Sequence, residues 1–227
     1  MKNLIFVALL AATPALAQPA EPRTIAMSGH GEVRAAPDQA QVNTGVTTSA
    51  PTAAAALAAN TVRMQALFAA LAKAGIAQKN IQTVNFSVSP QYTNGGPNQP
   101  ARVTGYQVTN QLAVRLDDVA RVGATLDALV TAGSNDMNGI SFSIKDPAPL
   151  LEKARADAVA DARARAQTYA HAAGVTLGPV LSISESGGEA PRPMFRMAAG
   201  MVAAAPTPVA AGEQTVSAEV SMVWEIH

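Results

Sequence analysis

The sequence predicts an α+β fold with mixed, largely antiparallel sheets and about three helices packed on them. Two observations support this prediction. Segments in which apolar and polar residues alternate, as in a half-buried strand, recur along the chain, and three longer segments carry apolar residues at helical spacing. The 227 residues include no cysteine. The fold must therefore be held by core packing, with no disulfide framework.

The first seventeen residues have the three parts of a secretory signal peptide, namely a charged start, a short apolar run and an Ala-x-Ala site that ends at Ala17. The run is shorter than the roughly 20 residues that a membrane-spanning helix needs. We expect residues 1–17 to be removed by cleavage between Ala17 and Gln18. No cysteine follows the site to carry a lipid anchor, so residues 18–227 are expected to work in the periplasm.

Two strands and a helix open the mature chain. Thr24–Val33 and Ala40–Val46 each alternate apolar with small or polar residues, and a Pro-Asp turn signal separates them. A helix is expected over Thr52–Ala74, where apolar residues form a broad helical face. Thr52 can cap its first turn, and Gly75 is placed to end it.

A hairpin is expected next. Ile81–Tyr92 places Phe86 between two valines at alternate positions, which is typical of a strand with one apolar face. The Asn- and Gly-rich residues 94–98 favour a turn or loop. Val103–Leu116 then returns as the second strand of the hairpin.

A second helix is expected over Asp117–Ala132, followed by a strand around Phe142. The third helix is expected over Pro147–Ala173 and ends at a glycine. Alanine recurs at every fourth position from Ala154 to Ala170. Such small side chains allow a helix to lie close to a sheet or another helix, while charged residues on its other faces indicate a solvated surface.

The last third of the chain contains two further strands, Val180–Ser184 and Val216–Ile226, the second with strict alternation. Residues 187–212 between them are rich in Gly, Pro, Ala and Met, and we expect a long flexible loop there.

Each of the three predicted helices ends in Ala-Gly, and the strands after the first two are similar to each other. One interpretation is a duplicated helix-strand unit. The other is the general preference for glycine after a helix, and the sequence leaves both open.

Charge excludes one class of partner. The whole chain has 16 basic and 16 acidic residues, and the leader removes one lysine, so the mature chain is almost neutral. A neutral chain has no general attraction to nucleic acid. No segment after the leader is expected to be long and apolar enough to cross a membrane as a helix, although peripheral membrane contact is allowed. We expect a homo-oligomer.

No catalytic constellation is found, and the chain is predicted not to be an enzyme and to need no cofactor. The histidines, His30, His171 and His227, are too widely spaced for a local zinc motif. Gly29-His30-Gly31 sits inside a predicted strand, whereas a phosphate-binding loop lies between a strand and a helix N-terminus.

Three methionines in the predicted loop are the metal candidates. Met194, Met197 and Met201 could share one face of a helical segment, and their thioethers could then bind Cu(I). The alternative function is therefore a periplasmic ligand- or metal-binding protein that uses this loop. A loop that packs onto a partner subunit is favoured over copper.

Several short motifs occur in an order and spacing that resemble the SIMPL domain family. The opening resembles that family's Gly-x-Gly-x-Val followed by Pro-Asp-x-Ala. The matching residues are Gly29-His30-Gly31-Glu32-Val33, Pro37-Asp38-Gln39-Ala40, Ile81-Gln82-Thr83, Pro90-Gln91-Tyr92, Gly105-Tyr106, Gly139-Ile140-Ser141-Phe142, Ala173-Gly174-Val175-Thr176-Leu177-Gly178 and Gly212-Glu213. The resemblance covers essentially all of residues 18–227.

The resemblance implies a periplasmic or surface protein of the type termed periplasmic immunogenic or oxidative-stress defence protein. It implies an α+β fold and no agreed catalytic site, so no active-site residue is carried over. It also implies large ring- or barrel-like homo-oligomers for some members. The expected function is a self-associating, non-enzymatic role in envelope or oxidative stress tolerance.

Overall fold

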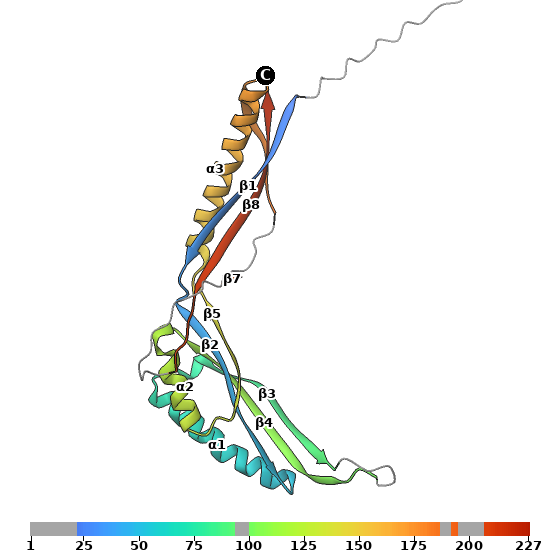
Figure 1. Cartoon of the computed structure of the whole chain (residues 1–227), viewed down its shortest axis with the longest axis vertical. Coiled ribbons are helices and arrows are strands. Elements are labelled where there is room, and N and C mark those ends of the chain that lie inside the picture. The colour runs from blue at the N-terminus through green and yellow to red at the C-terminus, as the bar shows by residue number, and fades with distance from the viewer. Residues whose placement is uncertain (1–21, 94–99, 187–191, 195–206) are drawn as a thin grey trace, which may run out of the picture.

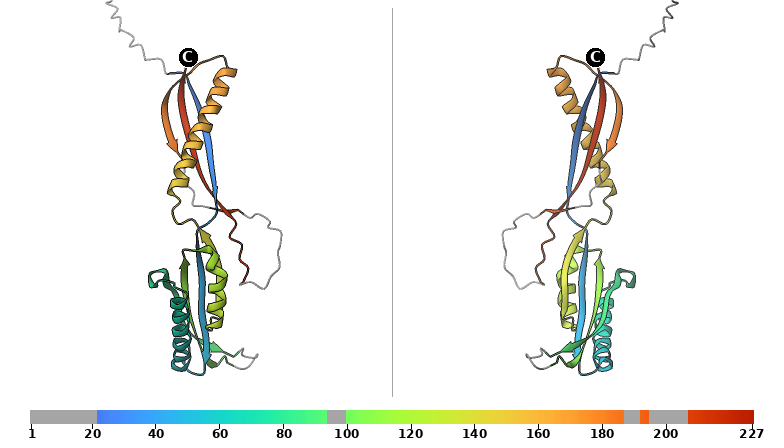
Figure 2. Two further views of the ribbon diagram at one scale, coloured as in Figure 1. Left: turned by 90° about the vertical axis from the view of Figure 1, so that its left-hand side faces the viewer. Right: turned by 90° about the vertical axis from the view of Figure 1, so that its right-hand side faces the viewer.

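The computed structural model describes residues 22–93, 100–186, 192–194 and 207–227, and these form an elongated molecule of two lobes set end to end (Figures 1 and 2). The terminal lobe contains β1 (Thr24–Ala35), α3 (Ala148–Ala172), β6 (Leu177–Glu185), β7 (Arg192–Met194) and β8 (Glu213–Ile226). The central lobe contains β2 (Gln39–Ala50), α1 (Ala53–Lys73), β3 (Ile81–Tyr92), β4 (Val103–Leu116), α2 (Val122–Thr131) and β5 (Asp136–Ser143). Short 3₁₀ turns at Gln78–Asn80 and Val119–Arg121 precede β3 and α2. The predicted α+β class is confirmed.

The central lobe is a βαββαβ unit with the topology called ferredoxin-like. Its sheet has the order β3-β4-β2-β5, and each neighbouring pair is antiparallel. Leu67 and Leu71 of α1 pack with Leu126 and Leu129 of α2 in one core cluster that also includes buried side chains of β2 and β4. Both helices therefore cover the same face of the sheet, and no described helix covers the opposite face.

This topology contains a repeat. In β2-α1-β3, and again in β4-α2-β5, a helix joins two parallel strands with one strand of the other unit between them. The arrangement agrees with the duplicated helix-strand unit. The glycine preference also holds, because Gly75, Gly133 and Gly174 have φ of 74°, 100° and 69° after the three helices.

The terminal lobe is built around β8. Strand β1 pairs with one edge of β8 from Thr24 to Ala35, and β6 and β7 share the other edge. Helix α3 covers one face of this sheet. The predicted alanine stripe from Ala154 to Ala170 is buried, and it packs with Trp224 of β8 in the second core cluster.

Local capping explains where two of the helices begin. The predicted cap is confirmed at α1, where the Thr52 hydroxyl accepts a hydrogen bond from the Ala55 N–H at 3.2 Å. Helix α2 begins at Val122 rather than at Asp117 as predicted. The Asp118 side chain accepts from the Ala120 N–H at 3.0 Å and caps the preceding 3₁₀ turn, so α2 starts after it.

Two other expectations need correction. The predicted loop over 187–212 contains a short strand, because Arg192–Met194 pairs with β8 and forms β7. Helix α1 is also long and apolar enough, by length and composition alone, to cross a membrane, contrary to the expectation that no segment after the leader would be. In the structure α1 packs onto β2 and β4, and core helices meet the same criterion.

The predicted leader and its cleavage site at Ala17 and Gln18 lie outside the described residues. They remain predictions.

Candidate functional site

The residues singled out for chemistry do not come together in the described part of the chain. There, no group of three or more His, Asp and Glu side chains is placed to hold a metal ion. His30 lies on β1 with Nε2 4.0 Å from a Glu32 oxygen, and both side chains are partly exposed. His171 lies in the last turn of α3, and His227 ends the chain after β8.

The methionine set is only partly covered. Met194 is the last residue of β7, opposite Glu213 of β8. Met197 and Met201 lie outside the described residues. The copper site therefore stays a prediction.

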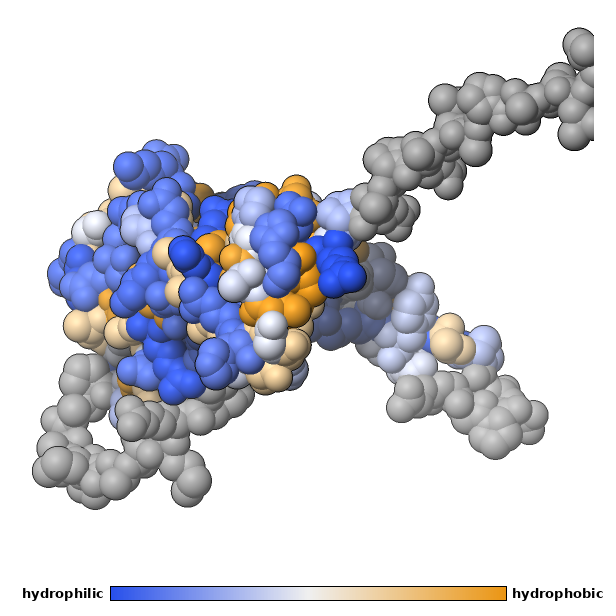
Figure 3. All heavy atoms as spheres, turned by 90° about the horizontal axis from the view of Figure 1, so that it is seen from above, coloured by the Kyte–Doolittle hydropathy of each residue, from blue (hydrophilic) through white to orange (hydrophobic). Residues whose placement is uncertain are grey.

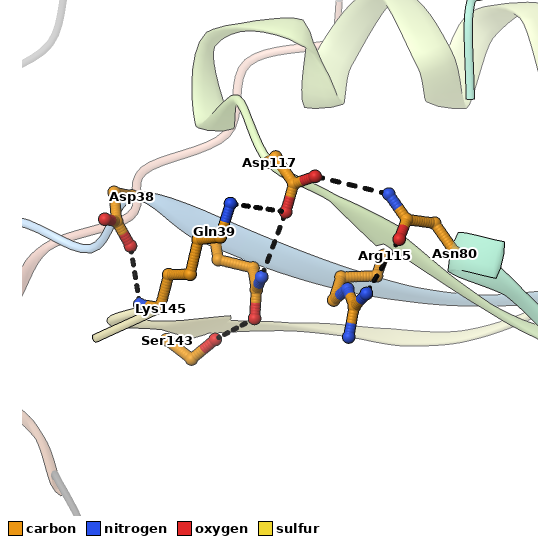
Figure 4. Close-up of polar contacts among 7 residues, drawn as sticks. All are labelled: Asp38, Gln39, Asn80, Arg115, Asp117, Ser143 and Lys145. Atoms are coloured by element: carbon orange, nitrogen blue, oxygen red, sulfur yellow. Dashed lines mark hydrogen bonds and ion pairs between the residues drawn. The ribbon is translucent and has the colours of Figure 1, made fainter. Parts of the chain in front are cut away.

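Polar side chains gather where the two lobes meet (Figure 4). The chain passes from β1 to β2 through Pro37 and Asp38, and from β5 to α3 through residues 144–147. The Asp38 carboxylate accepts a hydrogen bond from the Lys145 N–H at 2.7 Å. It thereby ties the two crossings together, which gives the Pro-Asp motif a structural role.

Asp117 is the centre of the same cluster. Its carboxylate accepts from the side-chain amides of Gln39 at 3.1 Å and Asn80 at 3.3 Å, and the Lys145 ammonium lies 3.8 Å away. The hydrogen bond from Gln39, then that from Asn80, and the nearby cations hold the pKa of Asp117 below its ordinary value. A carboxylate kept ionised by donors on three sides is suited to fixing the junction, and a general acid needs the opposite shift.

The Gly29-His30-Gly31 motif marks a close approach of helix and sheet. A Cβ at Gly29 would lie 2.0 Å from the Ala158 carbonyl oxygen, and one at Gly31 would lie 1.9 Å from that of Ala154. Only glycine allows β1 to contact the α3 backbone this closely. The motif therefore serves the packing of β1 against α3, in agreement with the prediction that it is not a phosphate-binding loop.

The charged side of α3 also contacts β1. The Asp161 carboxylate accepts from the His30 N–H at 3.0 Å and pairs with Arg165 at 3.0 Å, as the four-residue spacing indicates. The His30 N–H is the larger cause and Arg165 the smaller of a lowered pKa at Asp161. Asp161 thus satisfies a backbone donor on the outer edge of β1, an edge that would otherwise be open to pairing with another strand.

In the described part of the chain no carboxylate accepts from the outer edge of β3, which is instead interrupted by register shifts and by Pro90. Strand β3 forms one edge of the central sheet, and Phe86 and Val88 are 54% and 42% exposed. Both lie on the face that the helices cover, because they stand opposite Asn110 and Val108 of β4, and Val108 is fully buried. Helix α1 packs over β2 and β4 and barely reaches β3, so no described helix covers this part of the face.

Two exposed apolar residues of α1 lie on the side of this helix that faces β3. Leu57 and Phe68 are 41% and 42% exposed. By helical spacing they lie on the side of the buried stripe opposite Ala70 and Ala74, which face α2, and hence toward β3. We call Leu57, Phe68, Phe86 and Val88 the β3 apolar surface.

Apolar side chains are also visible at the end of the terminal lobe where β8 ends (Figure 3).

A β-bulge creates the β3 apolar surface. The register with β4 shifts between Thr83 and Asn85, so Ile81 and Phe86 lie on the same face although their separation is odd. The sequence showed the alternation at Phe86 but carried no sign that α1 would leave this strand uncovered. The sequence likewise placed Asp117 only at the start of a helix. Its role in the junction could not be predicted, because its partners come from distant segments.

Comparison with known proteins gives a family match. The family model described as "SIMPL: Protein of unknown function (DUF541)" matches residues 25–224, which span both lobes. The 26 kDa periplasmic immunogenic protein of Brucella melitensis is 39% identical over 215 residues, covering 91% of this chain and 86% of the relative.

For less similar relatives, the aligned region covers a smaller share of the relative. The uncharacterized protein YggE of Escherichia coli is 29% identical over 174 residues, covering 76% of this chain and 70% of the relative. A Xenopus laevis protein named interleukin-1 receptor-associated kinase 1-binding protein 1 homolog is 29% identical over 168 residues, covering 72% of this chain and 63% of the relative. Neither the family description nor these names state a catalytic activity.

Proposed function

The chain belongs to the SIMPL family, and from that premise we propose that it works in the periplasm as a self-associating, non-enzymatic protein that supports envelope or oxidative stress tolerance. The periplasmic assignment is supported by the leader sequence and by the name of the Brucella relatives. The stress role is supported by the family resemblance.

Self-association has its main support in one observation, the β3 apolar surface. An exposed apolar area on an edge strand marks a protein–protein contact, because soluble chains otherwise protect such edges. On its outer edge, away from β4, β3 offers backbone donors and acceptors beside that area, up to Pro90, which has no N–H. A second copy can satisfy both at once by pairing along the strand and covering Phe86.

Light scattering on residues 18–227 tests this proposal. The wild-type chain is expected to be an oligomer at tens of micromolar, and the Phe86→Ser, Val88→Thr double variant is expected to be a monomer. Both side chains are largely exposed, so the circular dichroism spectrum should not change. Val62→Thr is the matched control, because Val62 is 68% exposed on α1 and points away from the sheet.

A monomeric wild-type chain, or a double variant that remains as large as wild type, would contradict the proposal.

In cells, the strain that lacks the protein is expected to lose viability under peroxide, and only the wild type and Val62→Thr should restore it. Mass spectrometry of the periplasmic fraction should find a chain that begins at Gln18.

A further inference from the structure

The central lobe has an open groove between its two helices that the proposed function does not use. It has a volume of about 500 Å³, and it runs along α2 and over the last turn of α1. That volume is within the range of about 300–1,000 Å³ that small-molecule sites occupy. The groove lies on the side of α1 opposite the β3 apolar surface, so the two features are separate.

Alanine side chains explain why the groove is open. The large apolar residues of both helices, such as Leu71 and Leu129, point down into the core. Between the helices stand small side chains, which leave the space above the core unfilled. The alanines that line the groove are Ala70, Ala74, Ala124, Ala128 and Ala132.

Two cations also line the groove, Lys73 at the end of α1 and Arg121 just before α2. Neither forms an ion pair with a carboxylate in the described residues. The Arg121 guanidinium donates to the Ala74 carbonyl oxygen and so is held across the last turn of α1. The N-terminus of α2 adds its partial positive charge beside Arg121.

We propose that this groove binds an anionic amphiphile. The apolar chain would lie along Ala124, Ala128 and Ala132, and the carboxylate or phosphate head would contact Lys73 and Arg121. An apolar groove with positive charge at one end complements such a molecule, and it excludes a cationic one. A free fatty acid and a lysophospholipid share this chemistry, and the envelope can supply either.

Calorimetric titration of residues 18–227, below the micelle concentration of each probe, tests the proposal. The probes are dodecanoate, a dodecanoyl lysophosphatidylglycerol and neutral dodecanol. Dodecanoate is expected to bind more tightly than dodecanol. If only the lysophospholipid binds tightly, the groove recognises a phosphate head. If dodecanoate and the lysophospholipid bind equally, the groove recognises any anionic head on an apolar chain.

Groove-filling variants test the location. Ala128→Phe is expected to raise the Kd of the anionic probe at least about tenfold, because the ring occupies the path of the chain. Ala124→Phe does the same from an exposed position, and it guards against a folding defect in the first variant. Val130→Phe is the matched control on an exposed face of α2 outside the groove, and it should bind like wild type.

Charge variants test the head group. Lys73→Ala is expected to raise the Kd of dodecanoate about threefold and to leave that of dodecanol unchanged, as for a partly screened charge. Lys79→Ala, at an exposed lysine outside the groove, is the control. Absent binding of both anions, or equal binding by wild type and both groove-filling variants, would overturn the proposal.

Discussion

At the scale of single residues, the polar side chains of this protein are used to satisfy the backbone. Asp38 accepts from the Lys145 N–H, and Asp161 accepts from the His30 N–H. In both cases the carboxylate accepts from a backbone N–H that has no strand carbonyl as its acceptor in the described residues. Such bonds between distant segments fix how the segments lie relative to one another.

The pH dependence of stability tests the role of Asp161. Its pKa is lowered from 3.8 in the folded chain, so the ionised carboxylate stabilises the fold above that value. The contribution is lost as the pH falls through the lowered pKa. Asp161→Asn is therefore expected to be less stable than wild type at neutral pH, and the difference should shrink below pH 3.8.

Urea unfolding at a series of pH values measures this difference. Asp157→Asn is the matched control on the same helix, because Asp157 is in no ion pair among the described residues. The prediction is wrong if the difference in unfolding free energy between wild type and Asp161→Asn stays constant into acid. The hydrogen bond from the His30 N–H would then not require a charged acceptor.

At the scale of the elements, the close approach of α3 to β1 holds the terminal lobe together. Alanine on the helix and glycine on the strand form the two sides of this contact. Both signals are visible in the sequence, as a four-residue alanine stripe and a Gly-x-Gly pair. That they face each other could not be predicted, because more than a hundred residues of the central lobe separate them in the chain.

Gly31→Ala is the direct test of this contact. The new Cβ would lie 1.9 Å from the Ala154 carbonyl oxygen, so the helix must move away from the strand. We expect a loss of about 1–3 kcal/mol in the free energy of unfolding, which is the range for overpacking a core. Ser28→Ala, on the exposed face of β1, removes only an exposed hydroxyl bond to Ser221 at 3.2 Å and should change it by less than about 1 kcal/mol. A Gly31→Ala variant as stable as wild type would mean that the contact is looser than described.

At the scale of the whole molecule, the junction between the lobes is the feature on which the shape depends (Figure 1). Asp38 and the Asp117 cluster lie there, and the Gln214 side chain of β8 donates to the Phe142 carbonyl oxygen of β5. These contacts connect β1, β5 and β8 to one point. The proposed self-association would use such a fixed angle, because a closed oligomer repeats one geometry in every copy.

Hydrogen exchange tests the junction. In Asp38→Ala the Lys145 N–H loses its acceptor, and its exchange is expected to become roughly threefold to tenfold faster, as for the loss of one net hydrogen bond. The Ala148 N–H, which donates to Asp146 at 3.2 Å, is the control within the same molecule and should not change. Unchanged exchange at Lys145 would show that the two crossings are held by other contacts.

The sequence alone determined the α+β class, the order of the main elements and the glycine that ends each helix, because these depend on local periodicity and backbone conformation. It also carried the motifs of the family. The tertiary structure decided what local patterns cannot contain. It separated the chain into two lobes, brought Asp117 to its partners, placed Gly31 against α3, and left Phe86 and the alanine groove uncovered. Each of these depends on which distant segments pack together, and local sequence patterns do not specify those contacts.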